Sequence, residues 1–66
     1  MTIEYKATVQ HKDGRVIPIV DEYRHGEYKR SLTFADAPKF EDIFMAFNYA
    51  KTEADELNRR VHYEKR

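Results

Sequence analysis

Apolar residues recur at intervals of three and four positions through the last part of the chain, between Pro38 and Val61. The residues of this series are Phe40, Ile43, Phe47, Ala50, Ala54, Leu57 and Val61, with Phe44 beside them. This spacing places them along one face of a helix. We therefore expect a long amphipathic helix over residues 37–62, with Asp36 as its N-terminal cap.

Three shorter segments before the helix have the pattern of β-strands, at residues 2–11, 15–23 and 27–34. In the first segment apolar and polar residues alternate from Ile3 to Val9, which is typical of a half-buried strand. Gly14 favours a three-residue loop after the first strand, and His25-Gly26 favours a two-residue type I′ loop after the second. The prediction is a single α+β domain over residues 1–66. It consists of a three-stranded antiparallel meander sheet packed on one face by a long C-terminal helix, in the order β-β-β-α.

The loop lengths define which residues lie opposite one another, because a shift of one residue turns every side chain to the other face. The first hairpin is expected to pair Val9 with Ile17, Ala7 with Ile19, Tyr5 with Asp21 and Ile3 with Tyr23. The second is expected to pair Ile17 with Phe34, Ile19 with Leu32, Asp21 with Arg30 and Tyr23 with Tyr28. Ile17 and Ile19 would then face the helix. Pro18 has no N–H to donate, so we expect a bulge or weakened pairing where it faces the third strand.

This register produces one polar cluster on the helix-facing side of the sheet. Asp21 and Arg30 lie side by side in it, and three tyrosines surround them, namely Tyr5, Tyr23 and Tyr28. Arg30 could bind a small anion between the aromatic walls. The simpler interpretation is an ion pair that maintains the strand register, because partly buried charges are usually paired.

No set of residues in the sequence indicates catalysis or metal binding. The chain has no Cys, which excludes a thiolate zinc site. His11 and His25 are expected at opposite ends of the sheet, so at most His25 and His62 could meet. Ser31 is the only serine, and no His or acid is expected beside it. We therefore expect neither an enzyme nor a bound cofactor.

Composition limits the remaining possibilities. Twelve Lys and Arg balance twelve Asp and Glu, so no net field would attract nucleic acid or an acidic membrane. No segment has the roughly 20 apolar residues of a membrane span, and the first residues lack the apolar core of a signal peptide. Together with the absence of Cys, these features fit a cytoplasmic domain. A chain of 66 residues also builds only a small core, so self-association would add stability.

Two surfaces are expected to bind protein. Their residues are Val16, Pro18 and Val20 on the outer face of the sheet, and Leu57, Val61 and Tyr63 where the helix would extend past the sheet. The open edges of the first and third strands could also extend the sheet across a dimer. The leading interpretation is a non-enzymatic protein-binding module that first forms a homodimer.

The alternative interpretation is a nucleic-acid-binding domain. In element order, three antiparallel strands and a helix resemble the small DNA-binding domains of plant AP2 factors and the arm-binding domains of tyrosine recombinases. Those domains place a basic, aromatic sheet face in the major groove, whereas the outer face here mixes acids and bases, which argues against that function. Phosphate contacts could also come from the basic end of the helix, with Arg59, Arg60, Lys65 and Arg66. The helix dipole alone also favours cations at that position.

Overall fold

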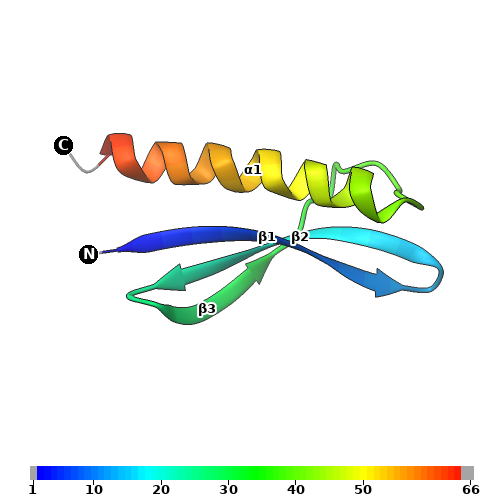
Figure 1. Cartoon of the computed structure of the whole chain (residues 1–66), viewed down its shortest axis with the longest axis horizontal. Helices are drawn as coiled ribbons and strands as arrows, with labels where there is room; N and C mark the ends of the chain where they lie inside the picture. Colours follow the sequence, from blue (N-terminus) through cyan, green and yellow to red (C-terminus); the bar gives the residue numbers. More distant parts are fainter. Residues whose placement is uncertain (1, 65–66) are drawn as a thin grey trace.

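The computed structural model describes residues 2–64 of the chain, and their side chains as far as residue 61. Its elements are β1 (Ile3–Lys12), β2 (Arg15–Arg24), β3 (Glu27–Leu32) and α1 (Ile43–Glu64). The strands form one antiparallel sheet in the order β1-β2-β3, and α1 packs against β1 and β2 on one face (Figure 1). The predicted α+β architecture, a three-stranded meander followed by a C-terminal helix, is confirmed.

The helix starts later than predicted, at Ile43 rather than near residue 37. Its cap is Asp42 and not Asp36: Asp42 Oδ1 accepts the Phe44 N–H at 2.9 Å, and the Asp42 carbonyl accepts the Ala46 N–H at 3.1 Å. Phe40, predicted to lie in the helix, instead accepts a hydrogen bond from the Val16 N–H at its carbonyl, at 3.0 Å. The preceding segment therefore runs alongside β2, and this pairing delays the helix.

The first loop has two residues, Asp13 and Gly14, so the predicted three-residue loop is wrong. Both residues have positive φ, 52° and 73°, which is the geometry of a type I′ turn. Lys12 therefore pairs with Arg15, and Val9 lies opposite Pro18 rather than Ile17. The shift of one residue turns the opposite face of β2 toward the helix.

The helix-facing residues of β2 are accordingly the even-numbered ones: Val16, Pro18, Val20 and Glu22, all of which are buried. Val20 is fully buried against Ala50 and Ala54 of α1, and the small alanines let the helix approach the sheet closely. Ile17 and Ile19, predicted to face the helix, lie on the outer face instead. Ile19 is nevertheless 6% exposed there, opposite Thr8.

The second hairpin keeps the predicted loop but not the predicted register. His25 and Gly26 form the turn with φ of 56° and 77°, and Tyr23 pairs with Tyr28 as expected. A bulge then shifts the ladder by one residue, so that Val20 pairs with Leu32. This bulge restores Leu32 to the helix-facing side, where it and Phe34 pack against the core as predicted.

Pro18 lies beyond the end of β3. The Val16 N–H points away from β1, toward Phe40, and strand alternation places the Pro18 nitrogen on the same side. Pairing between β2 and β3 ends at Val20 and Leu32, so no β3 residue faces the missing N–H. The expected weakening of pairing at Pro18 is confirmed, although the bulge lies elsewhere, at Glu22 and Tyr23.

Candidate functional site

The start of α1 carries a group of exposed apolar side chains, which we call the α1 start patch: Ile43, Phe44, Met45 and Phe47. Phe44 is the most open of them, with 75% of its surface exposed, and Met45 follows with 59%. Single exposed apolar residues are ordinary on protein surfaces, but four within five consecutive positions concentrate apolar side chains around the first turns of one helix. This patch is the main apolar feature of the described surface.

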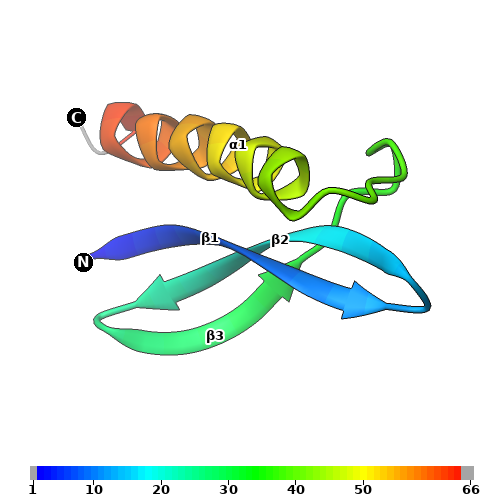
Figure 2. The same ribbon diagram turned by 45° about the vertical axis from the view of Figure 1, so that its right-hand side comes forward.

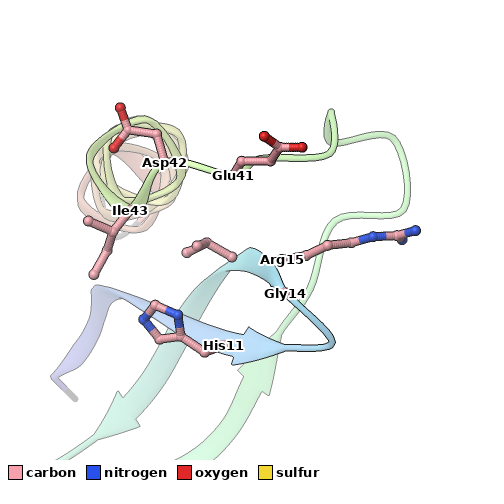
Figure 3. Close-up of a pocket in the computed structure, with 7 residues that line it drawn as sticks. His11, Gly14, Arg15, Glu41, Asp42 and Ile43 are labelled. Carbon is pink, nitrogen blue, oxygen red and sulfur yellow. The ribbon is translucent and has the colours of Figure 1, made fainter.

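The patch is uncovered because the sheet bends away beneath it. The right-handed twist of β1 and β2 carries their hairpin down and away from the first turn of the helix (Figure 2). An open cleft of about 600 Å³ separates the two, lined mainly by the hairpin and by Glu41, Asp42 and Ile43. The Ile43 side chain extends from the helix toward the cleft, on the side where the His11 ring rises from β1 (Figure 3).

The charged groups around this cleft do not converge. Arg15 and Glu41 extend away from the gap, and Asp42 points to the far side of the helix (Figure 3), where its carboxylate caps the Phe44 N–H. In the described part of the chain, no three His, Asp or Glu side chains come together as a metal-binding group. The cleft therefore lacks the convergent polar groups of a catalytic or small-ligand site.

The outer edge of β1 is a second feature of the structure, and it is contacted by the C-terminal half of α1. Asn58 of α1 reaches over this edge and acts as a substitute for a neighbouring strand at Tyr5. Its Oδ1 accepts the Tyr5 N–H at 2.9 Å, and its Nδ2 donates to the Tyr5 carbonyl at 3.0 Å. Tyr5 is thus closed to further backbone pairing, and the edge beyond it remains open.

The predicted row of Tyr5, Asp21 and Arg30 is wrong, because the shifted register replaces Asp21 with Glu22. Glu22 is the buried carboxylate, 2% exposed, and it lies opposite both Tyr5 and Arg30. Its two oxygens accept hydrogen bonds from Arg24 Nε at 2.9 Å and from Arg30 Nε at 3.0 Å. The Arg24 hydrogen bond, supported by the hydrogen bond and charge of Arg30, holds the pKa of Glu22 below its usual 4.5 although burial opposes this.

All of the Glu22 carboxylate's bonding is internal, which fits a structural ion-pair cluster rather than a ligand pocket. Each oxygen has a guanidinium partner, and no buried side-chain polar atom of the described residues lacks a hydrogen bond. Burying a carboxylate is tolerated only with such compensation. Arg30 pairs with an acid as predicted, but the acid is Glu22 rather than Asp21, and Arg24 is its second partner.

Asp21 belongs to a separate network on the outer face of the sheet. Ser31 Oγ donates to Asp21 Oδ1 at 2.7 Å and lies 2.7 Å from the Tyr28 hydroxyl oxygen. The ring of Tyr23 meets Tyr28 edge-on at 5.9 Å, and Lys6 Nζ lies 5.0 Å from the Tyr23 ring centre. These aromatic residues therefore surround no helix-facing pocket, contrary to the prediction.

The two predicted protein surfaces also change. Val16, Pro18 and Val20 are buried on the helix-facing side of β2 and cannot form an outer strip. Leu57 packs against the core and Val61 is half-buried, so the overhanging part of the helix is its beginning rather than its end. The side chain of Tyr63 lies outside the described residues.

The basic end of the helix is partly neutralised. Arg59 Nη2 lies 3.0 Å from one oxygen of Glu56, and Arg60 Nε lies 3.7 Å from the other. The second of these has the i,i+4 spacing of ion pairs along a helix. Lys65 and Arg66 lie outside the described residues.

Sequence reasoning assigned Phe44 and Phe47 to the core and therefore missed the patch. One signal was present: at about 100° per residue, the run Ile43-Phe44-Met45 spreads apolar side chains around more of the helix than a single core-facing stripe can hold. Apolar side chains that surround a helix are all buried only if other parts of the protein cover the helix on more than one side. The sheet covers α1 on one side, so some of these side chains are exposed.

Within residues 2–64, no helix is both long and apolar enough to cross a membrane. No protein-family model, curated protein or solved structure gives a significant match to this chain. Inference about function consequently depends on the geometry of the patch and the sheet.

Proposed function

We propose that this chain is a non-enzymatic protein-binding module of the cytoplasm, and that the α1 start patch is its contact surface. The observation that supports this most strongly is the exposure of Phe44, 75%, among three other exposed apolar residues. Full burial of a Phe side chain is worth about 1.5–3 kcal/mol. Binding of a partner that covers this patch would be stabilised by burial of these side chains, which are exposed to water in the isolated chain.

The surroundings of the patch favour a protein over a membrane as its partner. Helices that lie on membranes carry Lys and Arg beside their apolar face, because lipid headgroups are often anionic. Here the residues immediately before the patch are Glu41 and Asp42. Acidic residues at the rim of an apolar centre are compatible with a protein interface, whose rim is polar.

The test is affinity capture by the intact protein from an extract of its host, with matched variants. Phe44→Ser and Phe47→Ser together remove the two aromatic side chains, and Lys51→Ser is a control one turn further along the helix. We expect proteins that are captured by the wild type and by the control but not by the double variant. If the double variant captures the same proteins as the wild type, the patch is not the contact surface.

A second candidate function is nucleic-acid binding, for which one observation argues. The shifted register places Tyr23 and Tyr28 on the open outer face, with Lys6 beside them, and aromatic rings next to cations can stack on unpaired bases. Fluorescence anisotropy with single-stranded RNA and DNA at low salt tests it. Binding that weakens with salt and with Tyr28→Ala would support this function, and its absence at low salt would exclude it.

A further inference from the structure

The outer edge of β1 carries a row of free backbone groups. The Tyr5 N–H and carbonyl point away from β2, as their bonds to Asn58 show. Strand alternation places the N–H and carbonyl of Ala7, Val9 and His11 on the same side. Among residues 2–64, no hydrogen bond reaches these three pairs of groups from outside the β1–β2 ladder. We call this stretch, residues 7–11, the open edge.

The chain protects the other edges of its sheet. β3 has only six residues and pairs with β2 through a bulge, and both features discourage edge-to-edge pairing. Where β2 extends past β3, the Val16 N–H bonds the Phe40 carbonyl at 3.0 Å. At Tyr5, the amide of Asn58 takes the place of a neighbouring strand. The open edge lacks such protection in the part of the chain that the structure describes.

Two side chains of the α1 start patch lie on the flank of α1 above the open edge. Phe47 precedes Asn58 by 11 residues, so at about 100° per residue the two side chains leave the helix within about 20° of each other. Because Asn58 reaches the outer edge of β1, Phe47 projects on the same side. Ile43, one turn earlier, extends toward the side where the His11 ring rises (Figure 3). Both apolar side chains are exposed, by 42% at Ile43 and 40% at Phe47.

There is room for an additional strand at this position. The hairpin of β1 and β2 bends away from the first turn of the helix (Figure 2). The resulting cleft of about 600 Å³ is lined by His11 on one side and by Ile43 on the other. Side chains of a strand along the open edge would therefore enter the cleft and contact the exposed apolar residues of the helix.

The face of the sheet away from the helix carries positive charge at the hairpin end of the open edge. Lys12 and Arg15 lie directly opposite each other there, an arrangement in which like charges repel. Neither of them forms an ion pair within residues 2–64. Asp13, in the turn between them, balances only one of the two charges. An acidic residue arriving beside Lys12 would therefore be favoured.

We propose that the open edge binds an extended segment of a partner protein, which adds antiparallel to β1 as a fourth strand. Residues of the segment opposite Ala7, Val9 and His11 face the helix and are apolar. The residue opposite Gln10 faces the other side and is acidic, because it lies diagonal to Lys12. This inference rests on the proposed function, because it uses the α1 start patch, and it names the kind of segment that binds.

The free groups themselves define the occupant as a strand. A row of N–H and carbonyl groups at every second residue is complemented by the backbone of another extended chain. The existing sheet is antiparallel, and antiparallel pairing is slightly the more stable of the two directions. Because Asn58 closes the edge at Tyr5, the segment pairs over about five residues.

Antiparallel pairing gives each residue of the segment a defined role. The two residues of a hydrogen-bonded pair exchange both of their backbone bonds, and their side chains point to the same face. The apolar residues opposite Ala7, Val9 and His11 therefore form all of the backbone hydrogen bonds to β1. The N–H groups of the residues opposite Thr8 and Gln10 point away from β1 and form none.

The test is an NMR titration of the isotopically labelled full chain with the acetylated and amidated peptide Val-Glu-Val-Thr-Val. We expect the amide signals of Ala7, Val9 and His11 to shift saturably at millimolar peptide or below, and the Tyr5 amide, already bonded to Asn58, to change little. Methylation of the three valine nitrogens should weaken binding about tenfold or more, because it removes the bonds to β1. Methylation of the Glu and Thr nitrogens is the matched control and should leave the affinity within about twofold.

A charge exchange tests the acidic position. The peptide Val-Lys-Val-Thr-Val should bind the wild type roughly twofold to fivefold more weakly than the Glu peptide. Lys12 is exposed, so Lys12→Glu is expected to fold, which circular dichroism checks. This variant should prefer the Lys peptide. If the preference does not reverse, the acidic residue is wrongly assigned.

Three results would overturn the added strand. These are unchanged Ala7, Val9 and His11 amides at millimolar peptide, equal weakening by both sets of methyl groups, and shifts that depend on protein concentration without peptide. The last of these would assign the open edge to a second copy of the chain.

The Phe44→Ser and Phe47→Ser double variant separates this failure from failure of the proposed function. If the double variant loses the proteins that the wild type captures while the peptide leaves the open edge unchanged, the patch binds protein and only the added strand is wrong. If it captures everything that the wild type captures, the proposed function fails as well.

Discussion

Asn58 ties the helix to the edge of β1, and its replacement by alanine tests that contact quantitatively. The substitution removes two hydrogen bonds to Tyr5, of 2.9 and 3.0 Å. Each is worth about 0.5–1.5 kcal/mol net. Water can reach the strand edge once the side chain is gone, so we expect a loss of about 1–2 kcal/mol for the pair rather than the upper sum. Alanine forms helix better than asparagine and returns about 0.5 kcal/mol.

Asn48→Ala is the matched control, because Asn48 is an exposed residue of the same helix and makes no hydrogen bond to the sheet within residues 2–64. It gains the same helix propensity and loses no contact. Guanidinium unfolding of both variants isolates the contribution of the contact. The free energy of unfolding of Asn58→Ala should fall about 1–2 kcal/mol below that of Asn48→Ala, equivalent to roughly 4–16 °C in Tm for a domain of this size. Equal stability of the two variants would refute the bridging role of Asn58.

Three further predictions concern stability. Because the folded state lowers the pKa of Glu22, its contribution is fully present above the usual value of 4.5 and is lost as the pH falls through the lower folded pKa. Unfolding measured from pH 6 to pH 2 should show this loss in the wild type and not in Glu22→Gln, which should itself be about 1.5–3 kcal/mol less stable at pH 7. His25→Asn should gain about 0.5 kcal/mol in chemical denaturation, because His25 has a φ of 56° and Asn is more favourable there; a loss would contradict the turn. Ala50→Leu should cost about 1–3 kcal/mol in the same assay, since Ala50 has no exposed surface; an unchanged midpoint would contradict the close helix–sheet contact.

Element order and one turn were predictable because their local signals agree. The alternation of β1, the His25-Gly26 turn and the alanines of α1 each point to one conformation. The helix-facing side of β1 and the inward position of Leu32 were also correct. At these positions polar and apolar residues alternate, so the sequence pattern is consistent with only one face of each strand packing against the helix.

The face of β2 was not predictable from alternation, because this strand has apolar residues on both sides. Val16 and Val20 compete with Ile17 and Ile19, and the larger isoleucines favoured the wrong face. The turn decides the matter: Asp13 adopts positive φ, so Asp13-Gly14 forms the type I′ turn that the Asp-Gly pair favours. Giving that dipeptide more weight would have placed β2 correctly.

The bulge beside Glu22 compensates for the exchange of faces in β2, and the same exchange buries Glu22. A regular second hairpin would have turned Leu32 to the outer face once the β2 face was exchanged. The bulge at Glu22 and Tyr23 moves the ladder by one residue, which returns Leu32 inward and brings Arg30 opposite Glu22. The residues around this bulge do not predict it, because the need for it arises from the register of the first hairpin.

The candidate site was hidden for a related reason. Phe44 and Phe47 continue the apolar period of the helix, and periodicity does not show where the sheet ends. Their exposure depends on the late start of α1 at Ile43 and on the twist that carries the hairpin away. Both depend on packing between distant parts of the chain.

Affinity capture with the intact protein and its matched variants tests the central claim most directly, that the α1 start patch is a contact surface for protein. Phe44 and Phe47 are exposed, so the Phe44→Ser and Phe47→Ser double variant should remain folded and should lose the proteins that the wild type captures. The Lys51→Ser control should retain them. If the folded double variant captures the same proteins as the wild type, the α1 start patch is not the contact surface.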